Sequence, residues 1–218
     1  MKEPIQFYTD KETKNSFNVL QNISHILNYN FVIIGGWAVY NYTKKQKSKD
    51  IDIIINPQTY ENLKNRNYIF KQIGNTDILY TKISNVEVDI FVTNLVTDLP
   101  IIINDIILSS TRGLFNNIYS NKNLLLILKT FSYFTRKTEN IKKAKDIIDV
   151  VSLLFFGNIN FNFIRKYKGY KNITYKDIEY ILLHYILPRG LAYKEHLGIF
   201  SDNEYYKYWD KVKKEIKI

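Results

Sequence analysis

The chain has 218 residues, of which 45% are hydrophobic, and this is sufficient for a packed core in one domain or two small ones. It contains no cysteine, which excludes disulfides, thiolate metal sites and cysteine nucleophiles, and its 3 histidines are too scattered to predict a zinc site. No apolar run is long enough to span a membrane and the N-terminus has no apolar signal region, so we expect a cytoplasmic protein without membrane contact.

The formal net charge of +10 permits binding to an anionic partner such as nucleic acid, because phosphate contacts dominate such binding. The chain is also crowded with Lys, Asn, Ile and Tyr, whose codons are rich in A and T. A biased genome could therefore supply the lysines without any selection for RNA binding. The charge permits RNA binding but does not demonstrate it.

Apolar residues at helical spacing predict an amphipathic helix within residues 10–29, and the Asn-Tyr-Asn sequence at 28–30 is expected to break it. A short apolar run at 31–34 then predicts a buried strand, which stops at the turn formed by Gly35 and Gly36. A helix-like stretch follows from Trp37. This part of the chain therefore predicts the order helix, strand, glycine turn, helix.

A second apolar run predicts a strand that carries Asp50 and Asp52. Alternate side chains of a strand share a face, so the two carboxylates point together while Ile51 and Ile53 point the other way. Two like charges at this separation raise each other's pKa unless a divalent cation lies between them or water solvates the edge. A magnesium ion is the natural occupant, and two solvated acids beside a tight turn are the alternative.

After this strand, Asn56 as cap and Pro57 at the first position predict a helix over 57–65. A run at 99–103 predicts a further short strand, and residues 105–120 are left unassigned. Between these segments, apolar runs bounded by turn residues predict strands at 68–73, 78–83 and 86–93.

Within the strand at 86–93, Glu87, Asp89 and Phe91 share one face, and valines and isoleucine form the other. If this strand lies beside the strand of Asp50, Asp89 completes a triad of carboxylates. The alternative is a surface acid on an edge strand.

From residue 121 the pattern changes to long helices, predicted at 122–136 and 141–155 with a join at 138–140. Lys129 and Arg136 are two helical turns apart and share a face of the first helix. Asp146 and Asp149 share a face of the second.

The Lys- and Tyr-rich remainder, residues 161–218, predicts three or four short helices. Thr174 and Asp177 form a capping-box variant that opens a helix, and residues 188–190 are expected to end it. Near the C-terminus, interleaved aromatic and basic residues indicate either a packing face with solvated lysines or a surface that stacks on single-stranded RNA: Tyr205, Tyr206, Tyr208 and Trp209 with Lys207, Lys211, Lys213 and Lys214.

A family resemblance is carried by the turn at Gly35 and Gly36, the helix after it and the strand sequence SKDIDI at 48–53. This order resembles the signature of the polymerase-beta-type nucleotidyltransferases. The sequence GGWAV at 35–39 is similar to the corresponding motif of small antibiotic-modifying nucleotidyltransferases and of the nucleotidyltransferase toxins of abortive-infection and toxin–antitoxin systems.

The resemblance implies roles for the residues of this motif. Gly35, Gly36 and Ser48 would cradle the phosphates of an NTP, because glycine lets backbone amides approach closely. Asp50 and Asp52 would hold Mg²⁺, or Mn²⁺ in its place, which bridges the phosphates.

The resemblance also assigns roles to residues later in the chain. In the family a third Asp on a later strand often serves as metal ligand and as base, and Asp89 has that place. The helical half resembles that of the toxins, in which a Lys and a basic patch contact nucleotide phosphates and an Asp on the next helix helps the active site. This implies such roles for Lys129, Arg136 and Asp146, with Asp149 as second choice. The alternative is a solvated basic helix face with capping carboxylates.

The predicted fold class is α+β, with a small mixed sheet as the nucleotidyltransferase core over residues 1–120 and a helical C-terminal region over 121–218. The leading functional hypothesis is transfer of an NMP from an NTP to the 3′ end of an RNA, with tRNA as acceptor, in a toxin-like system with a cognate antitoxin protein. A second hypothesis keeps the chemistry with a small hydroxyl compound or a protein side chain as acceptor. A third is a non-catalytic binding module of the same fold.

Overall fold

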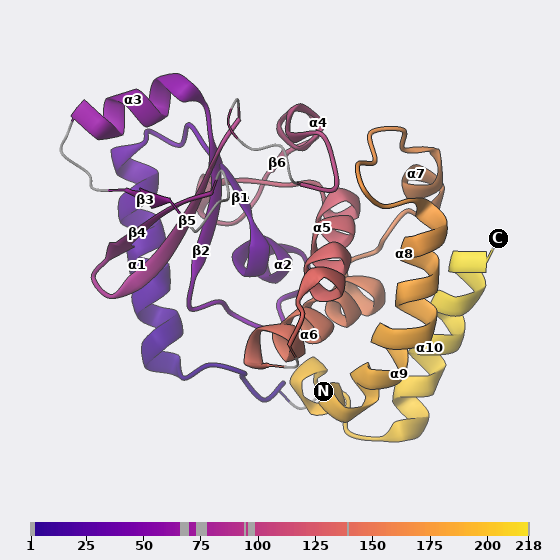
Figure 1. Cartoon of the computed structure of the whole chain (residues 1–218). Coiled ribbons are helices and arrows are strands. Elements are labelled where there is room, and N and C mark those ends of the chain that lie inside the picture. Colours follow the sequence, from indigo (N-terminus) through magenta and orange to yellow (C-terminus); the bar gives the residue numbers. More distant parts are fainter. Residues whose placement is uncertain are drawn as a thin grey trace.

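The computed structural model of the chain describes residues 3–65, 70–72, 78–93, 95, 99–138 and 140–217. These residues form an α+β fold, in which a mixed sheet with its helices is followed by a half built of helices (Figure 1). The last strand ends at Tyr119 and the first helix of the second half begins at Lys122. One continuous set of buried apolar side chains runs through both parts, so they share a hydrophobic core.

The described strands form a seven-stranded sheet in the order β3-β4-β5-β2-β1-β7-β6. β2 pairs with β1 in antiparallel fashion and with β5 in parallel fashion, and β7 is parallel to β1. The central strands are almost continuously apolar because helices cover both faces of the sheet there. The bounds are β1 (Val32–Ile34), β2 (Ile51–Ile55), β3 (Lys71–Gln72), β4 (Ile78–Ile83), β5 (Val86–Val92), β6 (Thr111–Arg112) and β7 (Ile118–Tyr119).

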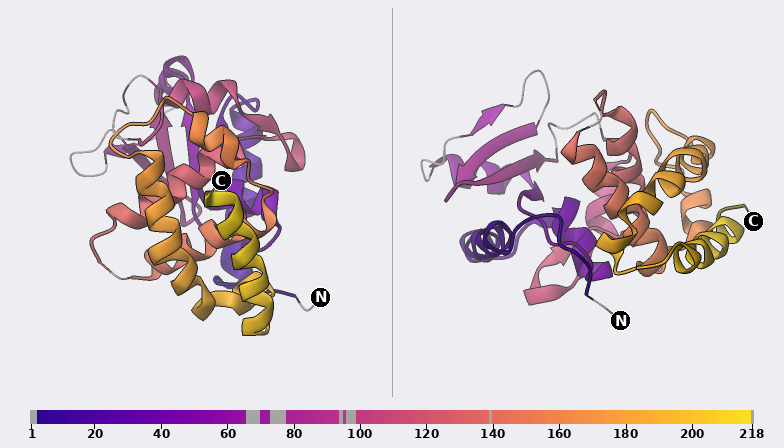
Figure 2. Two further views of the ribbon diagram at one scale, coloured as in Figure 1. Left: turned by 90° about the vertical axis from the view of Figure 1, so that its right-hand side faces the viewer. Right: turned by 90° about the horizontal axis from the view of Figure 1, so that it is seen from below.

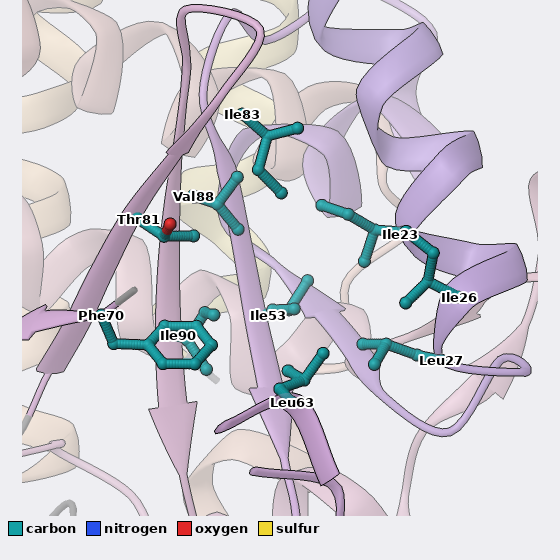
Figure 3. A pocket seen from close by; sticks show the side chains of 10 residues that line it. All are labelled: Ile23, Ile26, Leu27, Ile53, Leu63, Phe70, Thr81, Ile83, Val88 and Ile90. Carbon is teal, nitrogen blue, oxygen red and sulfur yellow. The ribbon is translucent and has the colours of Figure 1, made fainter. Parts of the chain in front are cut away.

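One face of the sheet is covered by the first helix. Thr9 and Glu12 form a capping box that starts this helix, and Ile23 on its inner side faces Ile53 of the sheet. Figure 3 shows the small apolar cavity, of about 20 Å³, that remains between the helix and this face. The helices of the first half are α1 (Asp10–Ile26), α2 (Gly35–Thr43), α3 (Pro57–Asn65) and α4 (Ile103–Leu108), with a 3₁₀ turn η1 (Leu114–Asn116).

The second half packs against the other face of the sheet. Asn121 and Asn140 cap its two longest buried helices, α5 and α6, by accepting hydrogen bonds from backbone N–H groups. No described helix is both long enough and apolar enough to cross a bilayer. The elements are α5 (Lys122–Thr135), α6 (Ile141–Phe156), α7 (Phe161–Lys166), α8 (Tyr175–Ile181), a π-helix η2 (Leu182–Ile186), α9 (Leu187–Gly190), a 3₁₀ helix η3 (Leu191–Leu197) and α10 (Asp202–Lys217).

The predicted strand at 99–103 is wrong. Ile101 makes only an isolated bridge with Tyr170, and Ile103 begins α4. Ile101 and Ile103 are buried, and a short apolar run does not distinguish this kind of burial from that of a strand. The unassigned residues 105–120 hold the rest of α4, η1 and the strands β6 and β7.

The predicted helix end at residues 188–190 is also wrong, because the helical path continues from α8 through η2 and α9 into η3. Pro188 lies in the first turn of α9, where a missing backbone N–H costs little. At the N-terminus, the first helix ends at Ile26, and Asn28 and Tyr29 have positive φ, so the predicted break at residues 28–30 is confirmed. Of the strand predicted at 68–73, residues 68, 69 and 73 lie outside the described residues.

The aromatic residues near the C-terminus serve mainly for packing. Tyr205 is fully buried, and its hydroxyl donates a hydrogen bond to the carbonyl of Leu187. Tyr206 is 43% exposed and stacks on Trp209. The packing alternative therefore holds for Tyr205.

Candidate functional site

Strand register places three carboxylates together. Asp52 of β2 pairs directly with Asp89 of β5, so the two side chains project side by side from the same face of the sheet. Asp50 lies two residues before Asp52 and lines the same cleft. The condition under which Asp89 completes the triad, that its strand lies beside the strand of Asp52, is therefore met.

The two glycines pack directly against this motif. Gly35 has a φ of +66°, in the left-handed region, and a Cβ there would lie 1.9 Å from Oδ2 of Asp52. A Cβ on Gly36 would lie 2.6 Å from Oγ of Ser48. α2 begins at this turn, and its N-cap residue Ile34 offers no side-chain hydrogen bond, so the first amide N–H groups of the helix remain available to an anion.

The carboxylates open into a cleft of about 90 Å³, which we call the carboxylate cleft. All the residues predicted from sequence to form the site line it, except Gly35, which adjoins it through Asp52. Tyr8, Lys142 and Lys145 also line it and were not predicted. The full lining is Tyr8, Gly36, Ser48, Asp50, Asp52, Asp89, Lys129, Arg136, Lys142, Lys145, Asp146 and Asp149.

An ion-pair network forms the helical wall of the carboxylate cleft. Nζ of Lys129 lies 2.8 Å from Oδ2 of Asp149 and 3.5 Å from Oδ1 of Asp146. Nε of Arg136 donates to Oδ2 of Asp146 at 2.6 Å, and Lys145 pairs with Asp149. Asp146 and Asp149 thus hold the cations of the cleft in place, and Asp149 is the more deeply buried of the two.

The three sheet carboxylates lack such partners. Within the part of the chain that the structure describes, the side chains of Asp50, Asp52 and Asp89 have no hydrogen bond or ion pair with another residue. Burial raises the pKa of Asp52 to about 6, with Lys129 opposing the shift. Burial and the neighbouring Asp52 raise the pKa of Asp89 to about 7, and burial also holds the pKa of Asp50 above its usual value.

On the opposite wall, the charges of neighbouring side chains outweigh the effect of burial on the pKa of Lys129 and of Asp149, but not on that of Lys145. Burial alone would lower the pKa of Lys129, but Asp149 and Asp146 outweigh it and hold this pKa above its usual range. The pKa of Asp149 is lowered because Lys129 and Lys145 outweigh its burial. Burial lowers the pKa of Lys145. Lys129 therefore presents a permanent positive charge to the carboxylates of the sheet.

The donor set suits a divalent cation such as Mg²⁺ or Mn²⁺, because these hard cations prefer carboxylate oxygens and, among the described residues, no cationic side chain forms an ion pair with any of the three carboxylates. Among the described residues, no group of three or more His, Cys, Asp or Glu side chains is already arranged to hold a metal. Carboxylates that repel one another separate when no cation lies between them. The chemistry of the three side chains therefore fits the ion, and they would have to move together to ligate it.

The N-terminal segment brings Tyr8 to the carboxylate cleft. The fully buried Gln46 side chain accepts a hydrogen bond from the N–H of Phe7 at 2.8 Å. It also donates to the carbonyls of Ile5 at 2.8 Å and His196 at 2.6 Å. This clamp fixes the segment between the loop after α2 and the helical half, and it directs Tyr8 into the cleft.

The phenol of Tyr8 remains protonated, because burial and the charge of Asp50 raise its pKa above the usual value. It can therefore donate a hydrogen bond in the cleft. No sequence motif marks Tyr8, since it precedes the first predicted helix. Lys142 and Lys145 could have been found, because Lys142 lies four residues before Asp146 and Lys145 lies four residues before Asp149, which places each lysine on the same side of α6 as its aspartate.

No known family model matches this chain, and comparison with curated proteins gives no significant match. Its function is therefore inferred from the residues of the carboxylate cleft.

Proposed function

We propose that the chain is a nucleotidyltransferase that depends on a divalent cation and moves an NMP from an NTP to an acceptor hydroxyl. The observation that carries this proposal is the convergence of Asp50, Asp52 and Asp89 beside the Gly35 turn, opposite the charged Lys129. Among the described residues, these three carboxylates have no hydrogen-bond or ion-pair partner, and they face the ammonium group of Lys129 across the cleft. Such an arrangement suits a triphosphate with a bound metal ion. The resemblance of this motif to polymerase-beta-type nucleotidyltransferases supports the same chemistry.

The triphosphate would bind between the glycine turn and the helical wall. Backbone amides at the start of α2 and the hydroxyl of Ser48 would donate to the phosphates, because a helix N-terminus favours negative charge. Lys129 and Arg136 would offset the charge of the leaving pyrophosphate. Tyr8 would add a further donor from the N-terminal segment.

The transfer step needs a base for the acceptor hydroxyl. Asp89, which lies beside Asp52 at the cleft, would accept the proton of that hydroxyl. The acceptor oxygen forms a bond to the α-phosphorus as the bond from the α-phosphorus to the bridging oxygen of pyrophosphate breaks. A Mg²⁺ ion held by Asp50, Asp52 and Asp89 would supply charge stabilisation for the phosphates.

The leading acceptor is the 3′ end of an RNA such as tRNA, in a toxin-like system with an antitoxin partner. The formal net charge of +10 supports an anionic acceptor. The GGWAV motif also favours a second class of acceptor, which is a small hydroxyl compound or a protein side chain.

The test is incubation of the protein with NTPs labelled at the α-phosphate and Mg²⁺, with and without total tRNA. We expect label in the tRNA and its loss in Asp50→Ala and Asp52→Ala. Asp210→Ala, which removes an exposed acid on α10, is the matched control and should keep full activity. Label in the protein alone would reject RNA as acceptor, and unchanged transfer in both Ala variants would leave only a non-catalytic module.

A further inference from the structure

The row of side chains that contains Asp52 and Asp89 continues toward the edge of the sheet. Tyr80 of β4 lies directly opposite Asp89, and Lys71 of β3 lies directly opposite Tyr80. Residues directly opposite each other project from the same face of a sheet. The row therefore runs from Asp52 through Asp89 and Tyr80 to Lys71.

The next row on the same face adds a second lysine. Lys82 lies opposite Glu87. Lys82 is two residues from Tyr80 along β4, and Glu87 is two residues from Asp89 along β5, so both share the face of the first row. We call Lys71, Tyr80 and Lys82 the open sheet face. Both lysines are exposed and Tyr80 is partly exposed.

The open sheet face has the features of a free surface. Within the part of the chain that the structure describes, the side chains of Lys71, Tyr80 and Lys82 have no hydrogen bond or ion pair. The reverse face of the same strands is covered, since Thr81 and Ile83 line the apolar cavity against α1 (Figure 3). β3 and β4 form the edge of the sheet that lies farthest from the helical half (Figure 2).

An aromatic ring flanked by lysines on a sheet suits single-stranded nucleic acid. Unpaired bases stack on aromatic side chains that project from a sheet, and lysines contact the adjoining phosphates. A lysine on an edge strand also discourages pairing with another chain, but that role does not need a tyrosine next to Asp89. The exposed Lys142, across the carboxylate cleft, adds a third cation around the site.

The direction of approach follows from the order of strands. Asp52 has the β1 strand, with Ile34 and the glycine turn after it, on one side and Asp89 on the other. If the triphosphate occupies the side of the glycine turn, as the proposed function requires, the acceptor must arrive from the side of Asp89. That side leads directly to Tyr80.

We propose that the open sheet face binds the unpaired 3′ end of an RNA acceptor. A terminal base stacks on Tyr80, Lys71 and Lys82 contact the phosphates that precede it, and the terminal hydroxyl reaches Asp89. This inference rests on the proposed function for its reaction, while the binding itself can be measured without NTP.

The first test measures binding of a short single-stranded RNA, labelled with fluorescein at its 5′ end, by fluorescence anisotropy without NTP. Tyr80→Ala should weaken binding about tenfold or more, and Tyr80→Phe should keep it, because stacking needs the ring and not the hydroxyl. The double variant Lys71→Glu with Lys82→Glu should also bind more weakly, and its affinity should depend less on salt. The same RNA annealed to its full complement should bind more weakly than the single strand.

Matched controls separate this face from general effects of charge and aromatic content. Tyr180→Ala removes a tyrosine that is 54% exposed on α8, and Lys11→Glu reverses an exposed lysine on α1. Both should bind the RNA as the unchanged protein does. Unchanged RNA affinity in Tyr80→Ala and in the double lysine variant would overturn the inference. If Tyr80→Ala does not fold, the double lysine variant still gives the test, because both lysines are exposed and their substitution should leave the fold intact.

A transfer assay separates failure of this inference from failure of the proposed function. In Tyr80→Ala, KM for the RNA should rise while KM for the NTP stays unchanged. If the protein transfers nucleotides to a protein or small molecule and does not bind RNA, the inference is overturned and the transferase proposal stands. If it binds RNA through Tyr80 but transfers nothing, the binding surface stands and the transferase proposal fails.

Discussion

Asp52 and Asp89 are adjacent in the strand register and have raised pKa values because burial opposes their ionised forms, as does the charge of a neighbouring carboxylate, Asp50 for Asp52 and Asp52 for Asp89. A group whose pKa is higher in the folded state than in the unfolded state binds more protons when folded. The free energy of unfolding therefore falls as the pH rises from about 4, near the unfolded pKa, to about 7, the folded pKa of Asp89. These acids cost stability at neutral pH in the absence of a cation.

From this we predict that Asp89→Asn stabilises the metal-free protein at pH 8 by roughly 1–3 kcal/mol and by a clearly smaller amount at pH 5, because the cost of the raised pKa grows up to about pH 7 and Asn stays neutral throughout. Thermal unfolding at the two pH values measures the difference. Mg²⁺ should raise the Tm of the unchanged protein at pH 8 and raise that of the variant much less. If Asp89→Asn were less stable than the unchanged protein at pH 8, the interpretation that Asp89 carries a destabilising negative charge at this pH would be wrong.

Gly35 gives a second prediction at the residue scale. Gly35→Ala places a side chain at a φ of +66° and within 1.9 Å of Oδ2 of Asp52, so it should displace that carboxylate and abolish nucleotide transfer. The backbone conformation should cost about 1–2 kcal/mol of stability. Gly198→Ala is the matched control, because its φ of +75° gives similar strain at a distance from the cleft. Equal activity in both variants would argue against a role for the glycine turn.

At the scale of elements, sequence patterns predicted those helices and strands whose signals are local. The cap at Asn56 and Pro57 marks α3, which has the predicted bounds, and alternation marks β4 and β5. The strand prediction at 99–103 is wrong because Ile101 makes only an isolated bridge with the distant Tyr170, a contact that no local pattern contains. Pro188 failed as a helix end because the preceding π-turn lets the helical path continue.

The contact between α5 and α6 depends on Asp149. Asp149→Ala leaves Lys129 and Lys145 buried without their shared counter-charge, which should cost roughly 3–5 kcal/mol in the free energy of unfolding. Asp146→Ala should cost less, because its partner Arg136 is partly exposed and can turn to water. Urea unfolding of both variants gives the comparison. A larger loss for Asp146→Ala would show that the network is assigned wrongly.

At the scale of the whole molecule, the carboxylate cleft combines parts far apart in the chain. Sequence spacing predicted Asp50, Asp52 and Asp89 as a set, because strand alternation is local and only the adjacency of two strands had to be assumed. Tyr8 could not be predicted, since its position depends on the clamp from Gln46 to the carbonyl of His196. The contacts that place Tyr8 in the cleft form only in the folded chain and leave no pattern in the sequence.

The clamp itself gives a prediction. Gln46→Ala removes a buried side chain that bonds to Phe7, Ile5 and His196, and should cost roughly 1–3 kcal/mol of stability. It should also release the N-terminal segment to limited proteolysis and weaken NTP binding, because Tyr8 leaves the cleft. Gln21→Ala, which removes a partly exposed glutamine side chain of α1, is the control. Unchanged proteolysis of residues 3–9 would contradict the clamp.

The central claim is that the sheet carboxylates serve nucleotidyl transfer, and comparison of NTPs labelled at the α- or the γ-phosphate tests it most directly. With Mg²⁺ and tRNA, we predict that only the α-label enters the acceptor, that the γ-label leaves as pyrophosphate, and that Asp52→Ala abolishes both events. Transfer of the γ-label to the acceptor, or α-label transfer that persists in Asp52→Ala, would contradict the claim.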